Sequence, residues 1–119
     1  MTTAYERVNA LAEFEIIAGT NFTLEFTSYE EIGGANILLD LTTSTVSWSA
    51  SYLGQTGSVI ITKSGTITDA INGEWNVELL KADTENLQGV LIHQPKITDV
   101  AGTEFLPAQG IFTIVPAIS

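Results

Sequence analysis

Alternation of apolar and polar residues is the feature that most limits what this chain can fold into. In the segment 45–53, TVSWSASYL, the apolar residues Val46, Trp48, Ala50 and Tyr52 occupy every second position, and a serine follows each of the first three. Because successive side chains of a β-strand point to opposite faces of its sheet, this pattern predicts a strand that is packed on one side and faces water on the other.

The same alternation recurs along the chain and predicts an all-β fold. The segments 22–29 and 74–80 are the clearest further strands. Their expected inward residues are Phe22, Leu24, Phe26, Trp75, Val77 and Leu79. Weaker strands are expected at 13–17, 37–41, 58–63, 66–68, 89–98 and 110–115. Short strands rich in threonine and isoleucine and separated by glycine, asparagine and aspartate are typical of a sandwich or barrel.

The N-terminus reads differently from the rest of the chain. Residues 1–12 are expected to form a short helix or an arm, followed by the β-domain over residues 13–119. Tyr5, Val8 and Leu11 recur there at helix-like spacing. We interpret these three residues as candidate assembly contacts, and a frayed terminus is the alternative.

A single helical turn is also expected at 82–89, ADTENLQG, where it would join two strands across the domain. Asp83 or Thr84 would be the N-cap, because a side-chain oxygen there can accept a hydrogen bond from the first free backbone N–H groups. Gly89 would end the turn.

Pro95 interrupts the expected strand at 89–98. Proline has no backbone N–H, so it removes one donor from the hydrogen-bond ladder, and such a strand is expected at a sheet edge or with a bulge. An edge strand exposes groups with which another chain can pair. Pro95 is therefore a fourth candidate assembly contact.

Two similar segments, ITDAINGEW at 67–75 and ITDVAGTEF at 97–105, each run from Ile-Thr-Asp through a short link with glycine to an acid and an aromatic residue. Aspartate tolerates turn conformations and glycine supplies positive φ, so both segments are expected to be hairpin turns. A calcium site is the alternative, but each turn offers one aspartate and one glutamate, fewer than the about six to eight oxygen ligands required. We expect no metal.

Composition narrows the classes of function. The chain has 119 residues, the size of one domain, and a net charge of −10, which disfavours binding to nucleic acid or to an anionic membrane surface. It has no cysteine, no leader-like N-terminus and no apolar stretch long enough to span a bilayer. Only 15% of the residues are charged, which suggests a surface that binds a partner, including copies of the same chain. A soluble product made in the cytoplasm is expected.

Catalysis has few candidate residues. His93 is the only histidine, so a catalytic triad or a multi-histidine metal site would have to be built around it. A half-exposed or hydrogen-bonded structural histidine is the preferred interpretation. Glu30 and Glu31 are adjacent carboxylates without a local apolar pocket, and the glycine-bearing loops lack the phosphate-loop and dinucleotide patterns. We expect no catalytic residues and no cofactor.

Three longer segments carry a resemblance to a known family: IIAGTNFTLEF at 16–26, ILLDLTTSTVSWSAS at 37–51, and the run from 67 to the closing GIFTI strand. The second holds Asp40, Leu41, Thr42, Val46 and Trp48 at matching positions. The chain resembles the immunoglobulin-like domains of tail and baseplate proteins of long-tailed bacteriophages. It departs from the pattern at Pro95 and at residues 43 and 44, where Gly-Ala is common.

The resemblance implies an immunoglobulin-like antiparallel β-sandwich with a short N-terminal helix or arm. It also implies a structural or adaptor protein of the virion, in the tail or baseplate, which docks without catalysis on other virion proteins or on copies of itself. A homo-oligomer is expected. A carbohydrate-binding module is the alternative if Trp48, Tyr52 or Trp75 is exposed. A small hydrolase is the third hypothesis, and it requires a pocket that brings His93 together with carboxylates.

Overall fold

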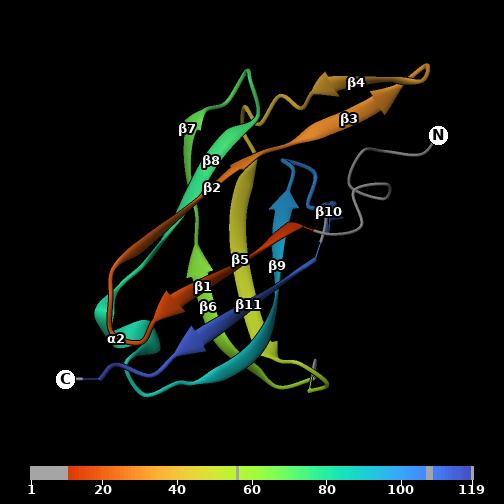
Figure 1. Cartoon of the computed structure of the whole chain (residues 1–119). Helices are drawn as coiled ribbons and strands as arrows, with labels where there is room; N and C mark the ends of the chain where they lie inside the picture. The colour runs from red at the N-terminus through yellow and green to blue at the C-terminus, as the bar shows by residue number, and fades with distance from the viewer. Residues whose placement is uncertain (1–10, 56, 107–108, 119) are drawn as a thin grey trace.

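The computed structural model describes residues 11–55, 57–106 and 109–118 and shows two β-sheets packed face to face (Figure 1). The expected all-β sandwich is confirmed. Its elements are β1 (Leu11–Ile17), β2 (Phe22–Thr27), β3 (Tyr29–Ile32), β4 (Ala35–Leu38), β5 (Thr45–Tyr52), β6 (Val59–Ser64), β7 (Thr66–Asp69), β8 (Glu74–Leu79), α2 (Lys81–Thr84), β9 (Gly89–Thr98), β10 (Glu104–Phe105) and β11 (Gly110–Val115).

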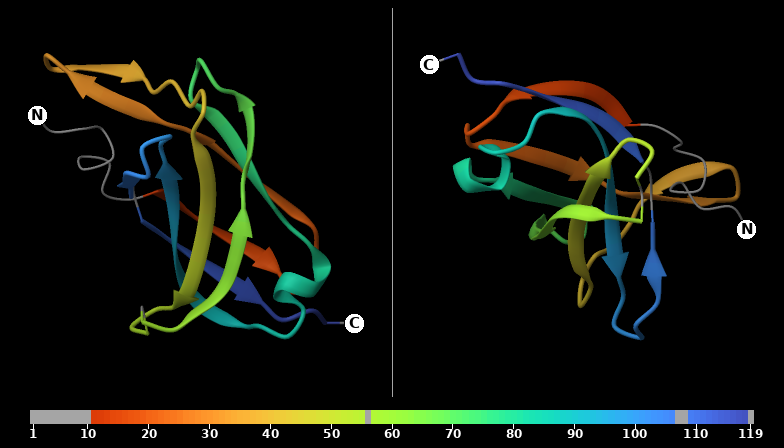
Figure 2. Two further views of the ribbon diagram at one scale, coloured as in Figure 1. Left: turned by 180° about the vertical axis from the view of Figure 1, so that it is seen from behind. Right: turned by 90° about the horizontal axis from the view of Figure 1, so that it is seen from below.

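The larger sheet has the strand order β1-β11-β9-β5-β6, with β10 pairing to β9 beyond the end of β11. β1 runs parallel to β11, and the remaining neighbours are antiparallel. The smaller sheet has the order β2-β8-β7 and is antiparallel throughout. The β3–β4 hairpin extends away from both sheets (Figure 2).

This strand order is that of an immunoglobulin-like sandwich. When β2, β5, β6, β7, β8, β9 and β11 are taken as strands B, C, C′, D, E, F and G, one sheet is G-F-C-C′ and the other is B-E-D. Trp48 occupies the position of the buried tryptophan on strand C. Since the chain has no cysteine, no disulfide joins the two sheets, and the sandwich depends on packing instead.

The core lies between the two sheets and is made of the residues that the alternation predicted to face inward. Trp48 and Trp75 are buried, one from each sheet, and every second residue of β5, β8 and β9 is buried with them. Phe14 of β1 stacks on Phe22 of β2, with ring centroids 5.4 Å apart, and so links the two sheets along one side. The buried apolar residues are Ile16, Leu24, Leu41, Val46, Trp48, Ala50, Ile61, Trp75, Val77, Leu79, Leu91, Ile97, Phe112 and Ile114.

Ser28 ends β2 one residue before β3 begins, so the strand expected at 22–29 is divided. Its backbone N–H donates to the Gly73 carbonyl at 2.9 Å, and its hydroxyl accepts from the Trp75 indole N–H at 3.1 Å. Gly73 has φ of +69°, and a Cβ there would lie 2.6 Å from the Ser28 carbonyl oxygen. Only glycine fits this contact, which directs the chain out of the sheet into the hairpin.

The expectation for the helical turn was wrong about its start. α2 begins at Lys81 and Leu80 is its N-cap, three or four residues before the predicted caps. Asp83 lies inside the turn, where its carboxylate accepts from the Leu80 backbone N–H at 2.7 Å. Thr84 is buried, and its hydroxyl accepts from the Gly19 N–H at 3.0 Å, which ties the turn to the β1–β2 connection.

Pro95 is not at a sheet edge, contrary to the prediction. β9 lies between β5 and β11, and the Pro95 side chain is buried. The missing backbone N–H of Pro95 is tolerated because no described strand pairs with β9 at this position on the side away from β5. β11 pairs with β9 as far as His93, and β10 begins to pair only at Ile97. A buried Pro95 is not available as an assembly contact.

The two Ile-Thr-Asp segments both form hairpin turns, as expected. In the β9–β10 turn, the Asp99 carboxylate accepts from the backbone N–H groups of Ala101 and Thr103, each at 2.9 Å. In the β7–β8 turn, the Asp69 carboxylate accepts from the Asn72 side chain at 2.8 Å. Each aspartate closes its own loop, Asp99 with an Asx-type bond to the backbone and Asp69 with a side-chain bond.

Candidate functional site

His93 lies in the aromatic core and is 1% exposed. Its Nδ1 accepts a hydrogen bond from the Trp48 indole N–H at 2.8 Å, and the rings of Phe14 and Phe112 contact it edge-on with centroids 5.5 Å away. Burial lowers the pKa of His93 to about 4, because the charged imidazolium is poorly solvated in this setting. The histidine is therefore neutral at physiological pH.

The hydrolase hypothesis required a pocket that joins His93 to carboxylates. The pocket that His93 borders has a volume of about 80 Å³ and is otherwise lined by serine, glutamine and aliphatic residues. Among the described residues, no group of three or more histidines and acids is placed to hold a metal ion. The arrangement that the hypothesis needed is not found around His93. Of the two forms in which a structural histidine was expected, the structure shows the hydrogen-bonded one, because the ring is buried and accepts from Trp48.

The tryptophans do not form a sugar platform. Trp48 and Trp75 are 0% and 1% exposed, and Phe26 stacks on Trp75 with centroids 4.5 Å apart. A ring that is covered on its faces cannot stack on a sugar. Tyr52, the third residue of the proposed platform, is half-buried at the end of β5.

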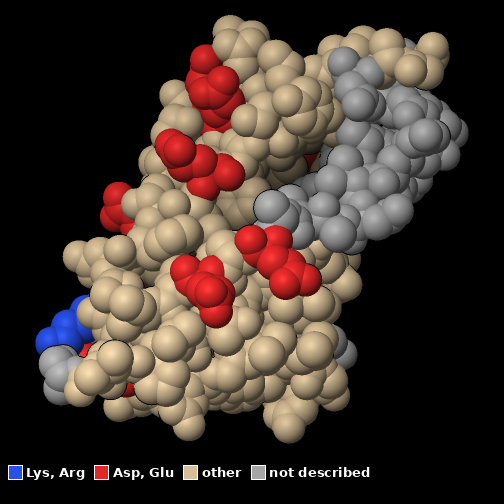
Figure 3. All heavy atoms as spheres, viewed as in Figure 1, with Lys and Arg blue, Asp and Glu red and all other residues tan. Residues whose placement is uncertain are grey.

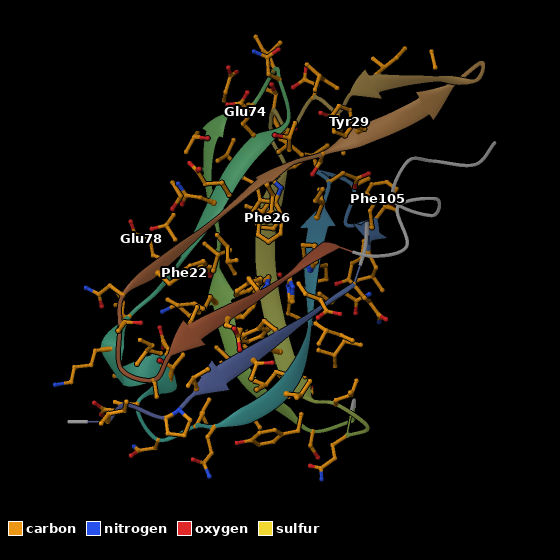
Figure 4. All side chains as sticks on the ribbon, viewed as in Figure 1. Phe22, Phe26, Tyr29, Glu74, Glu78 and Phe105 are labelled. Carbon is orange, nitrogen blue, oxygen red and sulfur yellow. The ribbon has the colours of Figure 1, made fainter. Side chains whose placement is uncertain are left out.

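Acidic side chains gather on the outer face of the smaller sheet. Glu25 of β2 and Glu74 and Glu78 of β8 are exposed there, at positions that alternate with buried residues. Figure 4 shows Glu74 and Glu78 pointing away from the larger sheet, whereas Phe22 and Phe26 point toward it. Threonine and asparagine fill the rest of this face, so it is polar and negatively charged.

The outer face of the larger sheet is different, because strands β11, β9, β5 and β6 present almost no charge there. We call this surface the uncharged face. Its members are Ser47, Ser49, Ser51, Val59, Thr62, Ser64, Val90, Ile92, Gln94, Ile111, Thr113 and Val115, with Lys96 as the charged residue among them. Figure 3 shows the β11 part of this surface free of acidic side chains, with acids over β1 and the smaller sheet.

Register explains how the uncharged face is built. Ile111, Ile92 and Val59 lie in one row across the sheet, with the buried Ser51 of β5 between Ile92 and Val59. Gln94, Ser49 and Thr62 form the next row. The pocket of about 80 Å³ opens between these rows, so the face is hollowed near its centre.

The predicted assembly contacts are not part of this surface. Tyr5 and Val8 lie outside the described residues. Leu11 is the first residue of β1 and pairs with Gly110 at the edge of the larger sheet, so the first strand starts two residues earlier than expected. Pro95 is buried. Sequence analysis therefore missed the uncharged face.

The sequence predicts the outward residues of each strand, but it does not predict that these strands form one continuous face. The outward phase of 89–98 and the serines of 45–53 are visible in the alternation. The sequence does not show which strands lie side by side. β5 and β9 are neighbours in the sheet, yet β6, β7, β8 and α2 lie between them along the chain.

The β3–β4 hairpin carries a second group of exposed apolar residues. Tyr29, Ile37 and Leu38 are each at least 39% exposed, and Tyr29 pairs directly with Leu38. Figure 4 shows Tyr29 at the base of this hairpin, beyond the body of the sandwich. A two-stranded hairpin is marginally stable by itself in water, so this element has apolar surface available for a partner.

Comparison with known proteins adds no assignment. The sequence matches no protein-family model and no curated protein. Among the described residues, no helix has the length and hydropathy needed to cross a membrane.

Proposed function

We propose that this chain is a non-catalytic docking domain, a structural or adaptor module of a phage tail or baseplate that binds copies of itself or other virion proteins. The observation that carries the proposal is the uncharged face. Fourteen acids and four basic residues are distributed over the sequence, yet four adjacent strands present a single charged side chain on their outer side. Depletion of charge is characteristic of the centre of protein–protein interfaces.

The size of the uncharged face is adequate for an interface. At about 4.8 Å between strands and about 3.3 Å per residue, the 6, 10, 8 and 6 residues of β11, β9, β5 and β6 give a projected area of roughly 500 Å². Specific interfaces bury about 800 Å² per partner, counted over a corrugated surface. The face and its borders therefore supply an area of the right order.

Charge distribution favours a second copy as a partner. Two molecules with a net charge of −10 repel each other on average. When they meet through the uncharged faces, Glu25, Glu74 and Glu78 of each copy lie on the far sheet, whereas Glu13 and Glu15 of β1 remain exposed beside the contact. This arrangement costs less electrostatically than contact through the smaller sheet, because it keeps the acids of that sheet apart.

Placement in a virion rests on the family resemblance. The segments 16–26, 37–51 and 67–114 resemble phage tail and baseplate domains of the immunoglobulin-like type, and the strand order is compatible with them. In that setting the domain links neighbouring virion proteins and needs no catalytic residues.

The test is a charge placed on the uncharged face. Val90→Glu should weaken self-association at least tenfold, because a buried unpaired carboxylate is strongly disfavoured at an interface. Ile71 lies in the β7–β8 turn and is 71% exposed, so Ile71→Glu is the matched control and should leave association unchanged. Sedimentation velocity over a range of concentrations measures the self-association of both variants and of the unmodified chain. A concentration-independent monomer for the unmodified chain, or equal effects of the two variants, contradicts self-docking through this face.

A further inference from the structure

A pocket of about 370 Å³ lies at the end of the sandwich next to α2 and the C-terminal segment. Tyr52 from the end of β5 and Leu87 from the α2–β9 connection form its apolar side. Glu85, Asn86 and Gln88 from the same connection form its polar side. In Figure 1 this region is the end of the molecule where α2 and the C-terminus lie.

The polar groups of this pocket are free to bind a ligand. Within the described part of the chain, the side chains of Glu85, Asn86 and Gln88 make no hydrogen bond or ion pair with another protein group. All three residues are exposed. One carboxylate and two carboxamides therefore present acceptors and donors on one side of the same hollow.

The apolar side is held in place by the fold. Tyr52 and Leu87 are half-buried and pack against the core, so their positions are fixed. Gly89 has φ of +114°, and a Cβ there would lie 3.7 Å from Cε1 of Tyr52. Because glycine carries no side chain, residue 89 places no atoms against this edge of the tyrosine ring.

We infer that this pocket binds a single neutral pyranose unit of a saccharide. A pyranose ring has an apolar C–H face that packs on an aromatic ring and hydroxyl groups at its rim that pair with carboxylates and amides. The pocket offers this combination through Tyr52 on one side and Glu85, Asn86 and Gln88 on the other. Glu85 and the net charge of −10 disfavour anionic sugars.

The volume fits one sugar unit. Small-molecule sites span about 300 to 1,000 Å³, and this pocket is near the lower limit. A ligand of this size in an open site is expected to bind in the millimolar range. The inference is independent of the proposed docking function, because the pocket and the uncharged face share no residue.

The experiment is a titration followed by ¹H–¹⁵N correlation NMR on the whole chain. The probes are glucose, N-acetylglucosamine, glucosamine and glucuronate. We expect glucose or N-acetylglucosamine to cause saturable shifts at Tyr52 and at residues 85–88, with glucuronate inactive. Glu85→Ala should weaken this binding about tenfold, because a charge-assisted hydrogen bond is lost. Glu78→Ala is the matched control on the acidic face and should bind as the unmodified chain does.

A second pair of variants examines the ring. Tyr52→Phe keeps the aromatic face and should retain most of the binding, whereas Tyr52→Leu should lose it, with the dispersion of the NMR spectrum reporting that each variant is folded. Several results would overturn the inference: no saturable shift with either neutral sugar, binding of glucosamine alone, shifts located away from this pocket, or equal effects of Glu85→Ala and Glu78→Ala. Val90→Glu should leave saccharide binding unchanged, which separates this inference from the docking proposal.

Discussion

At the scale of single residues, His93 shows how the core determines the state of an ionisable group. Because its Nδ1 accepts from the Trp48 N–H, the neutral ring carries its proton on Nε2. Nε2 is buried and has no protein partner among the described residues. Protonation would place a charge among Trp48, Phe14 and Phe112, which explains why burial lowers the pKa to about 4.

The lowered pKa of His93 predicts that the protein loses stability as the pH falls. In the unfolded chain a histidine titrates near pH 6.5, so between about pH 6.5 and pH 4 the unfolded state binds a proton that the folded state does not. The contribution is fully present above pH 6.5, and its loss at pH 4 amounts to about 3 kcal/mol. Urea unfolding at pH 7.5 and pH 5 measures the decrease.

His93→Gln is the control for this prediction, because glutamine can still accept from the Trp48 N–H and does not titrate. Its free energy of unfolding should depend less on pH over the same interval. The chain has no other histidine, and the carboxylates are common to both proteins. An identical pH dependence in the two proteins would show that His93 does not cause it.

At the scale of elements, the turn before β5 holds a threonine in a conformation that favours glycine. The Asp40 carboxylate accepts from the Thr42 N–H at 2.8 Å and from the Thr42 hydroxyl, and these bonds lower the pKa of Asp40. The next residue, Thr43, has φ of +66°. The phage domains that the sequence resembles commonly have glycine at this position, and glycine adopts positive φ without the steric cost that a β-branched residue meets.

Thr43→Gly is therefore expected to stabilise the protein by about 1 kcal/mol, since it removes the left-handed strain from an exposed threonine. Thr45 is also exposed and begins β5 with ordinary extended backbone, so Thr45→Gly should destabilise by about 0.5–1 kcal/mol. Denaturant midpoints of the two variants give the comparison. A decrease in stability for Thr43→Gly would mean that the threonine makes compensating contacts in the turn.

The α2 turn and Pro95 show where reading elements from sequence was wrong. Asp83 has the chemistry of an N-cap, but the helical turn begins earlier because the Lys81 N–H is satisfied by the Asn21 side chain, which is 60 residues away in the sequence. Pro95 has the chemistry of an edge residue, but the gap between β10 and β11 provides an interior position without a required donor. Both outcomes depend on segments distant in the chain.

At the scale of the whole molecule, charge is divided between the two outer faces of the sandwich. Glu25, Glu74 and Glu78 cover the smaller sheet. The uncharged face covers β11, β9, β5 and β6 of the larger one, and Glu13 and Glu15 of β1 are exposed beside it. The four cations do little to neutralise the acids, and Lys63 and Lys96 already pair with Asp83 and Glu104 at about 3 Å. The acids therefore lie on the smaller sheet and on β1, and the four strands next to β1 are suited to packing.

This division predicts that salt strengthens self-association. Raising NaCl from about 0.01 to 0.15 M shortens the screening length from about 30 to 8 Å and so reduces repulsion between copies of net charge −10. Burial of the uncharged face is little affected by the same change. We expect the dissociation constant to fall several-fold, as measured by sedimentation equilibrium. Association that weakens with salt would indicate an interface built from ion pairs.

The sequence by itself determined which residues face inward and which face outward within each strand. Trp48, Trp75 and Val77 are buried as their alternation predicted, and the Asp-Gly turns reverse the chain where aspartate and glycine allow it. These properties are local, because a strand has a period of two and a turn depends on a few adjacent residues. The all-β class follows from them directly.

Only the tertiary structure decided which strands are neighbours, and with that every surface that spans more than one strand. The uncharged face combines residues from 47 to 115, and the end pocket joins Tyr52 to Glu85 and Pro116. The burial of His93 was only partly predictable from the sequence. Its alternation with Leu91 and Ile97 indicates an inward position, but its aromatic neighbours come from other strands. The physical reason is that long-range strand pairing is selected by the packing of the whole core, which local periodicity does not encode.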